Sequence, residues 1–176
     1  MTKEVIEITP STTVHKLLED YPELEEVLIG IAPPFKKLKN PRLRKSVAKV
    51  ATLKHISVVG RIPLDELINT LRAAVNQPAS VETYEDEAYF VEQPGWFSTD
   101  KIAVSIEEAA VEDKDTMTVV TILREAKDVR AGEIIELVTT FIPAPGIDRM
   151  KALGYSAWVH KEDDGLIKTY FLKNFE

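Results

Sequence analysis

The stretch PFKKLKNPRLRKSVAKV, residues 34–50, has the residue types that most directly suggest binding chemistry. It contains seven Lys or Arg residues and no Asp or Glu. Cations at this density can neutralise the phosphates of a nucleic acid, another anion, or the carboxylates of an acidic protein surface. The wider segment 32–64 holds nine positive charges and no negative charge. This basic block is therefore the first candidate for a binding surface.

The candidate contact residues are the cations of the basic block and one histidine, which gains charge below pH about 6.5. They are Lys36, Lys37, Lys39, Arg42, Arg44, Lys45, Lys49, His55 and Arg61. One possible partner is nucleic acid, bound through segment 36–61. The other, which we favour, is an acidic protein surface. Segment 81–117 of this chain has eleven acidic residues and two lysines, so the same chain or a second copy could supply it.

The composition argues against several catalytic chemistries. The chain has no cysteine, which excludes disulfides, thiolate nucleophiles, persulfide transfer and cysteine-ligated metal centres. Its three histidines, His15, His55 and His160, are far apart in sequence, so no metal-ligand spacing is present. We find no nucleophile–base pair, glycine-rich phosphate loop or paired-carboxylate signature. We therefore expect no metal, no cofactor and a non-enzymatic protein, although an enzyme acting on a small molecule stays open.

A second candidate surface is the loop that joins a predicted strand to the next helix. Its candidate residues are Thr140, Phe141, Pro143 and Pro145. Backbone N–H groups at a helix N-terminus can bind an anion. However, each proline removes one such donor. We therefore favour a rigid connection that forms part of a docking surface.

The size and hydropathy of the chain predict one or two small domains. It has 176 residues, of which 44% are hydrophobic, and a formal net charge of −7. No apolar run approaches the roughly 18 residues of a membrane span. The first residues lack the apolar core of a signal peptide. We expect a soluble cytoplasmic protein without a membrane partner.

The N-terminal part, residues 1–75, is predicted to be a helical domain with a short strand at its start. Residues 4–10 alternate in polarity, which is typical of a strand. Helices are expected after the caps Ser11 or Thr12, between Pro22 and Gly30, over 40–56, and after Pro63. Residues 76–99 are predicted to be an acidic linker. Its aromatic residues, Tyr84, Tyr89, Phe90, Trp96 and Phe97, are expected to dock on a domain surface.

The C-terminal part, residues 100–176, alternates between strand and helix patterns in the order β-α-β-α-β-β. The run at 134–142 is mostly apolar, which indicates a central strand. Asp163-Asp164-Gly165 is a hairpin signal between the last two strands. The predicted fold class is α+β: a small helical domain followed by a two-layer sandwich with a four-stranded mixed sheet.

Residues 5–74 resemble the domain of unknown function 1858 family, a helical domain associated with hybrid-cluster and iron–sulfur-repair proteins. The motifs that carry the resemblance are I-T-P, V-x-x-L-L, Y-P-E-L and L-R-K-S-V-A-K-V-A-T-L. Some relatives have a cysteine pair near the end of the second helix. The corresponding region here is residues 30–35, without cysteine. A redox role of those cysteines therefore does not carry over.

Residues 94–174 resemble the domain of unknown function 2249 family, which has the TusA/SirA-like sulfur-carrier fold. The resemblance rests on P-G-W-F, on A-G-E-I-I-E-L-V-T-T-F-I-P-A-P and on K-A-L-G-Y-x-x-W. In sulfur carriers a cysteine opens the first helix. The matching position is Asp115, which we interpret as a helix N-cap. The resemblance implies a binding or adaptor protein, associated with redox, metal-cluster or sulfur metabolism, that lacks the carrier cysteine and acts on a protein partner or by self-association.

Overall fold

The computed structural model describes residues 5–84, 89–108 and 118–175. The chain divides into two compact units, Met1–Glu87 and Ala88–Glu176. No helix among the described residues combines the length and the apolar character needed to cross a membrane. The helical unit followed by a sheet-containing unit confirms the α+β fold class.

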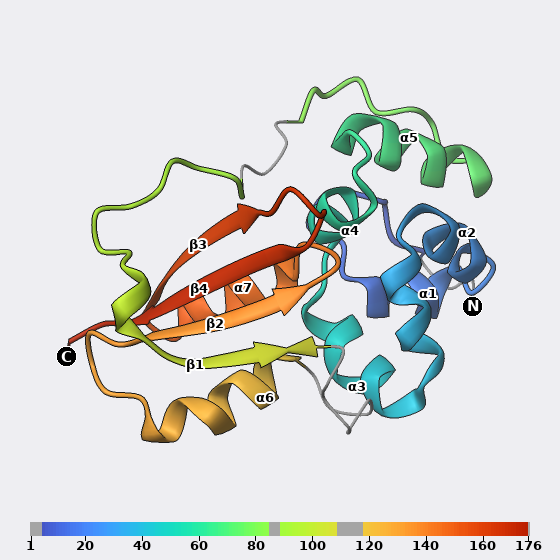
Figure 1. Cartoon of the computed structure of the whole chain (residues 1–176). Helices are drawn as coiled ribbons and strands as arrows, with labels where there is room; N and C mark the ends of the chain where they lie inside the picture. The colour runs from blue at the N-terminus through green and yellow to red at the C-terminus, as the bar shows by residue number, and fades with distance from the viewer. Residues whose placement is uncertain (1–4, 85–88, 109–117, 176) are drawn as a thin grey trace. The chain divides into compact units, whose positions relative to one another are not determined.

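The N-terminal unit consists of short helices joined by tight turns (Figure 1). They are α1 (Val14–Asp20), α2 (Leu24–Ile31), the 3-10 helix η1 (Pro33–Lys39), α3 (Pro41–Val50), α4 (Leu53–Gly60) and α5 (Leu64–Ala74). Their apolar faces form a core in which Leu17, Leu24, Leu53, Ile56 and Leu67 are fully buried. Helices of this length are marginal alone, so this shared core stabilises them.

The helix predicted over residues 40–56 is divided in the structure into α3 and α4. The backbone N–H of Thr52 donates to Nδ1 of His55 at 3.0 Å, which caps the start of α4. The carbonyl of Ala51 accepts the backbone N–H of Val14 at 2.8 Å, and Thr52 forms an isolated bridge with Thr13. The break therefore depends on contacts with α1, which apolar spacing within the segment does not reveal.

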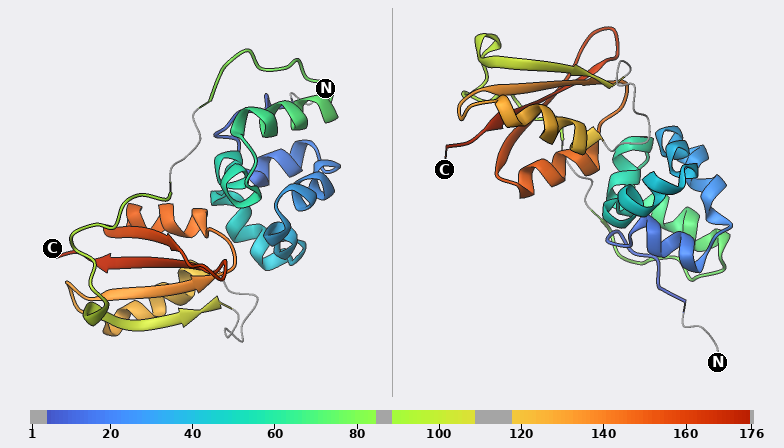
Figure 2. Two further views of the ribbon diagram at one scale, coloured as in Figure 1. Left: turned by 45° about the horizontal axis from the view of Figure 1, so that its top comes forward. Right: turned by 90° about the horizontal axis from the view of Figure 1, so that it is seen from below.

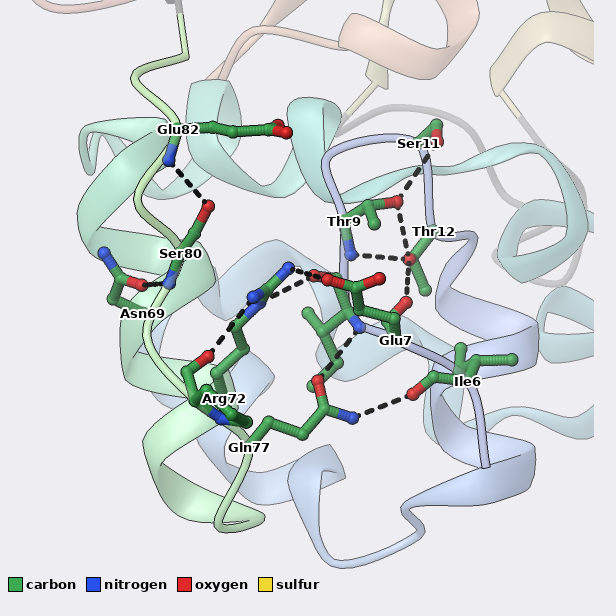
Figure 3. Close-up of polar contacts among 12 residues, drawn as sticks. Ile6, Glu7, Thr9, Ser11, Thr12, Asn69, Arg72, Gln77, Ser80 and Glu82 are labelled. Atoms are coloured by element: carbon green, nitrogen blue, oxygen red, sulfur yellow. Dashed lines mark hydrogen bonds and ion pairs between the residues drawn. The ribbon is translucent and has the colours of Figure 1, made fainter. Parts of the chain in front are cut away.

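The strand expected near the N-terminus is not formed in the described residues 5–9, which run extended along the helices (Figure 3). Their backbone partners are side chains. Nε2 of Gln77 donates to the carbonyl of Ile6 at 2.8 Å, and the N–H of Ile8 donates to Oε1 of Gln77 at 3.1 Å. Nε of Arg72 donates to the carbonyl of Ile8 at 2.9 Å. These side chains satisfy the backbone as a neighbouring strand would.

In its described residues the C-terminal unit contains one four-stranded sheet and two α-helices (Figure 1). Its elements are η2 (Thr99–Lys101), β1 (Ile102–Glu107), α6 (Thr118–Glu125), η4 (Ala126–Asp128), β2 (Ile134–Thr139), α7 (Ala144–Ala152), β3 (Tyr155–Lys161) and β4 (Ile167–Lys173). The strand order is β1-β2-β4-β3, with β1 parallel to β2 and the other neighbours antiparallel. The mixed sheet, the central β2 and the β3–β4 hairpin are as predicted.

Helices α6 and α7 cover the same face of this sheet (Figure 2). On β2, Ile135, Leu137 and Thr139 are buried on that face, and Phe171 of β4 is fully buried beside them. Nζ of Lys173 donates to the carbonyls of Ala126 and Val129 at 3.3 and 2.7 Å, which ties η4 to the end of β4. Neither α6 nor α7 covers the opposite face, which is called the open face.

Part of the open face is covered by the aromatic segment 89–97. Phe97 packs against Trp158 and Tyr170, with ring centroids 4.7 and 4.5 Å apart. The indole N–H of Trp158 donates to the carbonyl of Val91 at 3.1 Å. Tyr89, at the start of the segment, instead contacts the helix side of the unit: its hydroxyl donates to Oδ2 of Asp148 in α7 at 3.0 Å.

Most aromatic residues of the predicted linker thus lie against one of the two units. Tyr84 belongs to the N-terminal unit, where its backbone N–H donates to Oδ1 of Asp65 at 2.7 Å. Tyr89, Trp96 and Phe97 pack within the C-terminal unit. Phe90 is the exception, with 50% of its surface exposed.

Candidate binding surfaces

The cations of the basic block are distributed over η1, α3 and the region of α4. Asn40 begins α3 by accepting the backbone N–H of Arg42 at 2.9 Å, and Pro41 occupies the first turn. Leu43 and Ala48 point into the core. Arg42, Lys45 and Lys49 are exposed and lie three, four and seven residues apart, which places them on one side of the helix. We call these three residues the basic stripe.

Two cations of the block pair with carboxylates of α2. Nζ of Lys39 lies 2.8 Å from Oε1 of Glu26, and Nη1 of Arg44 lies 3.3 Å from Oε1 of Glu25. The hydrogen bond to Glu26 raises the pKa of Lys39 above its ordinary value. These pairs join η1 and α3 to α2, so Lys39 and Arg44 already have partners within the N-terminal unit.

Other members of the block have no such partner. Within the described residues, Lys36, Lys45, Lys49 and Arg61 make no ion pair, and all four are exposed. Lys45 and Lys49 are four residues apart on one helix, a like-charge arrangement that costs roughly 0.2–0.5 kcal/mol. Lys37 and Arg42 are exposed and have contacts of their own. Most of the cations without an ion pair therefore lie on η1 and the outer side of α3, and Arg61 follows α4.

His55 has a different environment from the other candidates. The residue is buried, with 8% of its surface exposed. Its Nδ1 accepts the N–H of Thr52 and so belongs to the cap of α4. We therefore leave His55 out of the proposed contact residues.

The loop before α7 is largely packed. Thr140 is exposed, Phe141 and Pro145 are half-buried, and Pro143 is buried. The hydroxyl of Thr139 donates to the carbonyl of Phe141, and no side chain caps α7. Asp115, which we expected to match the position of the sulfur-carrier cysteine, lies outside the described residues.

The open face of the sheet carries a polar cluster that sequence reasoning did not identify. Oγ of Ser105 in β1 donates to Oε1 of Glu136 in β2 at 2.6 Å. Nζ of Lys168 in β4 lies 3.9 Å from Oε2 of Glu136 and 3.1 Å from Oε1 of Glu162. The only available signal was the alternation of polar residues along each strand, and alternation does not reveal which strands are neighbours.

The charges of this cluster affect one another. The hydrogen bond to Glu162 and the charges of Glu136, Glu162 and Asp164 raise the pKa of Lys168. Burial raises the pKa of Tyr170 far above its ordinary value, and the nearby Glu136 carboxylate adds to this effect. The direction for Lys168 reflects the carboxylates around it, whereas that for Tyr170 reflects mainly its burial.

No group of three or more His, Asp or Glu side chains suited to a metal ion occurs in the described parts of the chain. His15, His55 and His160 lie on α1, α4 and β3. The ring of His160 lies beside Trp158, with centroids 5.4 Å apart.

Comparison with protein-family models supports the first of the two resemblances, that of the N-terminal part. Residues 8–68 match the model of a domain of unknown function (DUF1858). This match runs from the extended segment before α1 into α5 and includes the basic stripe. The comparisons lend no support to the second resemblance, over residues 94–174. No curated protein matches the chain, and no solved structure matches it.

Proposed function

We propose that this protein is a non-enzymatic binding or adaptor protein that docks an acidic protein surface on its basic stripe. The observation that carries the proposal is the exposure of Arg42, Lys45 and Lys49 on one side of α3. The stabilising pairs to α2 use Lys39 and Arg44 instead. A row of like charges weakens a helix. Binding of an external anionic partner would offset this cost and would explain why the three cations share one side of α3.

The metabolic context of this adaptor is part of the proposal. The resemblance of residues 94–174 to TusA-like sulfur carriers, and the redox and metal-cluster associations of domains like the N-terminal one, suggest sulfur, redox or metal-cluster metabolism. The strand and helix order of the C-terminal unit is compatible with that resemblance. Because the chain has no cysteine, it would act there by binding and not by carrying sulfur.

The test is quantitative co-purification from native extract with the full chain and two charge-reversed variants. Lys45→Glu/Lys49→Glu reverses two charges of the basic stripe. Lys127→Glu/Lys161→Glu makes the same change in net charge at exposed lysines of the C-terminal unit. We expect a saturable partner that the first variant loses and the control retains. Equal recovery by the two variants, or no partner for the wild type, would reject the proposal.

Nucleic-acid binding through segment 36–61 is the second candidate. It is favoured by the exposed cations without ion pairs, Lys36, Lys45, Lys49 and Arg61. Against it, α5 begins with the acids Asp65 and Glu66, which would repel phosphates.

A salt titration of oligonucleotide binding separates the two candidates. Affinity that falls steeply with salt, and that Arg42→Glu/Lys45→Glu abolishes, would favour nucleic acid. Weak binding that is indifferent to this substitution would leave the adaptor proposal in place.

A further inference from the structure

The open face of the C-terminal sheet has an uncovered half that complements the basic stripe. The aromatic segment covers the end around Trp158 and Tyr170. Towards the other end, Ser105, Glu107 and His160 are exposed. The register of the strands sets Glu107 on the same face as Glu136, beside Val138.

The uncovered half is acidic. Glu107, Glu136 and Glu162 contribute three carboxylates, and Lys168 lies among them as the one ammonium group of this cluster in the described strands. Glu162 and Lys168 keep 35% and 30% of their side-chain surface exposed, and Glu136 keeps 14%. We call Glu107, Glu136 and Glu162 the acidic sheet face. One ammonium does not balance three carboxylates, so cationic side chains are the ligands that this surface suits.

The dimensions of the two surfaces agree. From Arg42 to Lys49 the basic stripe spans seven residues of helix, or about 10 Å. From β1 to β3 the sheet spans three strand spacings, or about 14 Å. An α-helix can therefore lie across the strands with its cations over the carboxylates.

We propose that the basic stripe on α3 of one copy docks on the acidic sheet face of a second copy of this chain. This inference rests on the proposed function, since it names the acidic partner of the same stripe. Each copy has both surfaces, so one surface pair per contact is enough to bring two copies together. Charge complementarity is the driving interaction, and the contact weakens when salt screens it.

The test is the mass of the full chain in sedimentation velocity, measured as a function of protein and salt concentration. At about 0.1 M salt, where the Debye length is about 10 Å, we expect the average mass to rise with protein concentration. At about 1 M salt we expect a monomer. The variants Lys45→Glu/Lys49→Glu and Glu107→Lys/Glu162→Lys should each remain monomeric at 0.1 M salt.

Mixing the variants makes the test specific. Lys45→Glu/Lys49→Glu keeps the acidic sheet face, and Glu107→Lys/Glu162→Lys keeps the basic stripe, so a mixture of the two should associate. Controls with the same changes of net charge, Lys127→Glu/Lys151→Glu and Glu125→Lys/Asp128→Lys, involve exposed residues of α6, η4 and α7 and should behave as the wild type.

The outcomes separate this inference from the proposed function. A wild type that is monomeric at every concentration, or unchanged association of Glu107→Lys/Glu162→Lys, overturns self-docking. If Lys45→Glu/Lys49→Glu still loses a partner from extract, the adaptor proposal survives that result. If reversing the stripe changes neither measurement, both proposals fail.

Discussion

Arg72 is a buried charge whose partners are mainly backbone carbonyls (Figure 3). Its Nε donates to the carbonyl of Ile8, Nη1 donates to the carbonyl of Pro78 at 3.2 Å, and Nη2 lies 2.9 Å from Oε1 of Glu7. The side chain of Glu7 is 72% exposed, whereas that of Arg72 is 7% exposed. Arg72 therefore stabilises the fold more through its hydrogen bonds to the two carbonyls than through the ion pair with Glu7.

Two substitutions separate these contributions. Arg72→Met leaves two carbonyls without donors and should lower the free energy of unfolding by about 2–4 kcal/mol. Glu7→Gln removes only the exposed charge and should cost less than about 1 kcal/mol. Urea unfolding followed by far-UV circular dichroism measures both. Similar losses for the two variants would contradict this explanation.

Gly60 lies where α4 approaches α2. A Cβ atom at this position would be 2.8 Å from the carbonyl oxygen of Ile31 and 2.9 Å from its Cγ2. At Gly30, within α2, a Cβ atom would meet nothing within 4 Å. One glycine is thus required by close packing, and the other is not.

The two alanine variants should differ in sign. Gly60→Ala should destabilise the N-terminal unit by about 1–3 kcal/mol because of overpacking against the backbone. Gly30→Ala should stabilise it by up to about 1 kcal/mol through helix propensity. Amide hydrogen exchange resolved by peptide measures each change within this unit. The tryptophans, Trp96 and Trp158, report on the C-terminal unit and should be unaffected.

Thr169 and Thr139 are buried threonines on the helix-covered face of the sheet. The hydroxyl of Thr139 donates to the carbonyl of Phe141. The hydroxyl of Thr169 has no hydrogen-bond partner among the described atoms. Burying a hydroxyl without a partner costs about 1–3 kcal/mol.

Replacing each threonine by valine should therefore have opposite effects. Thr169→Val should raise the free energy of unfolding of the C-terminal unit by about 1 kcal/mol. Thr139→Val removes a formed hydrogen bond and should lower it by a similar amount. Urea unfolding followed by tryptophan fluorescence measures both. Destabilisation by Thr169→Val would mean that its hydroxyl has a partner, such as a bound water.

At the scale of elements, the aromatic segment acts as part of the sheet's core. The rings of Trp158 and Tyr170 stack at 5.4 Å, and Phe97 lies against both. As a result, Trp158 and Tyr170 are only 6% and 5% exposed, although they lie on the open face, which α6 and α7 do not cover. The aromatic segment thus covers part of the open face, as a layer of helices would.

Removing one ring from the segment should reveal this role. Phe97→Ala should cost about 3–5 kcal/mol and shift the tryptophan emission to longer wavelength as water reaches Trp158. Phe90→Ala is the matched control, because Phe90 is 50% exposed and should change stability by less than about 0.5 kcal/mol. Equal effects of the two substitutions would show that the segment does not shield the indole.

At the scale of the whole molecule, the absence of cysteine bears on the sulfur-carrier fold that we propose for residues 94–174. If residues 94–174 share that fold, position 115 corresponds to the carrier cysteine. In that fold the position opens a helix, so Asp115→Cys should then give a thiol whose pKa lies below the ordinary value of about 8.5.

The thiol pKa is measured from the pH dependence of alkylation. Thr140→Cys, at an exposed loop position, is the control and should titrate near the ordinary value. A thiol at position 115 that titrates like the control would argue against the sulfur-carrier resemblance. It would leave the observed sheet topology unchanged.

The sequence by itself determined the order of strands and α-helices in the C-terminal unit and the location of the basic block. Local signals were sufficient for these features. Apolar periodicity marked β2 and α5, Asn40-Pro41 marked the start of α3, and Asp163-Asp164-Gly165 marked the hairpin. Each depends on residues close together in the chain.

Tertiary structure alone decided the features that join distant residues. The break between α3 and α4 needs the backbone of residues 12–14, and the extended N-terminal segment needs Gln77 and Arg72. The polar cluster of the open face exists because the strand order brings Glu136 of β2 beside Lys168 of β4. Strand neighbours are chosen by the packing of the entire sheet, so the spacing of residues within one strand cannot reveal them.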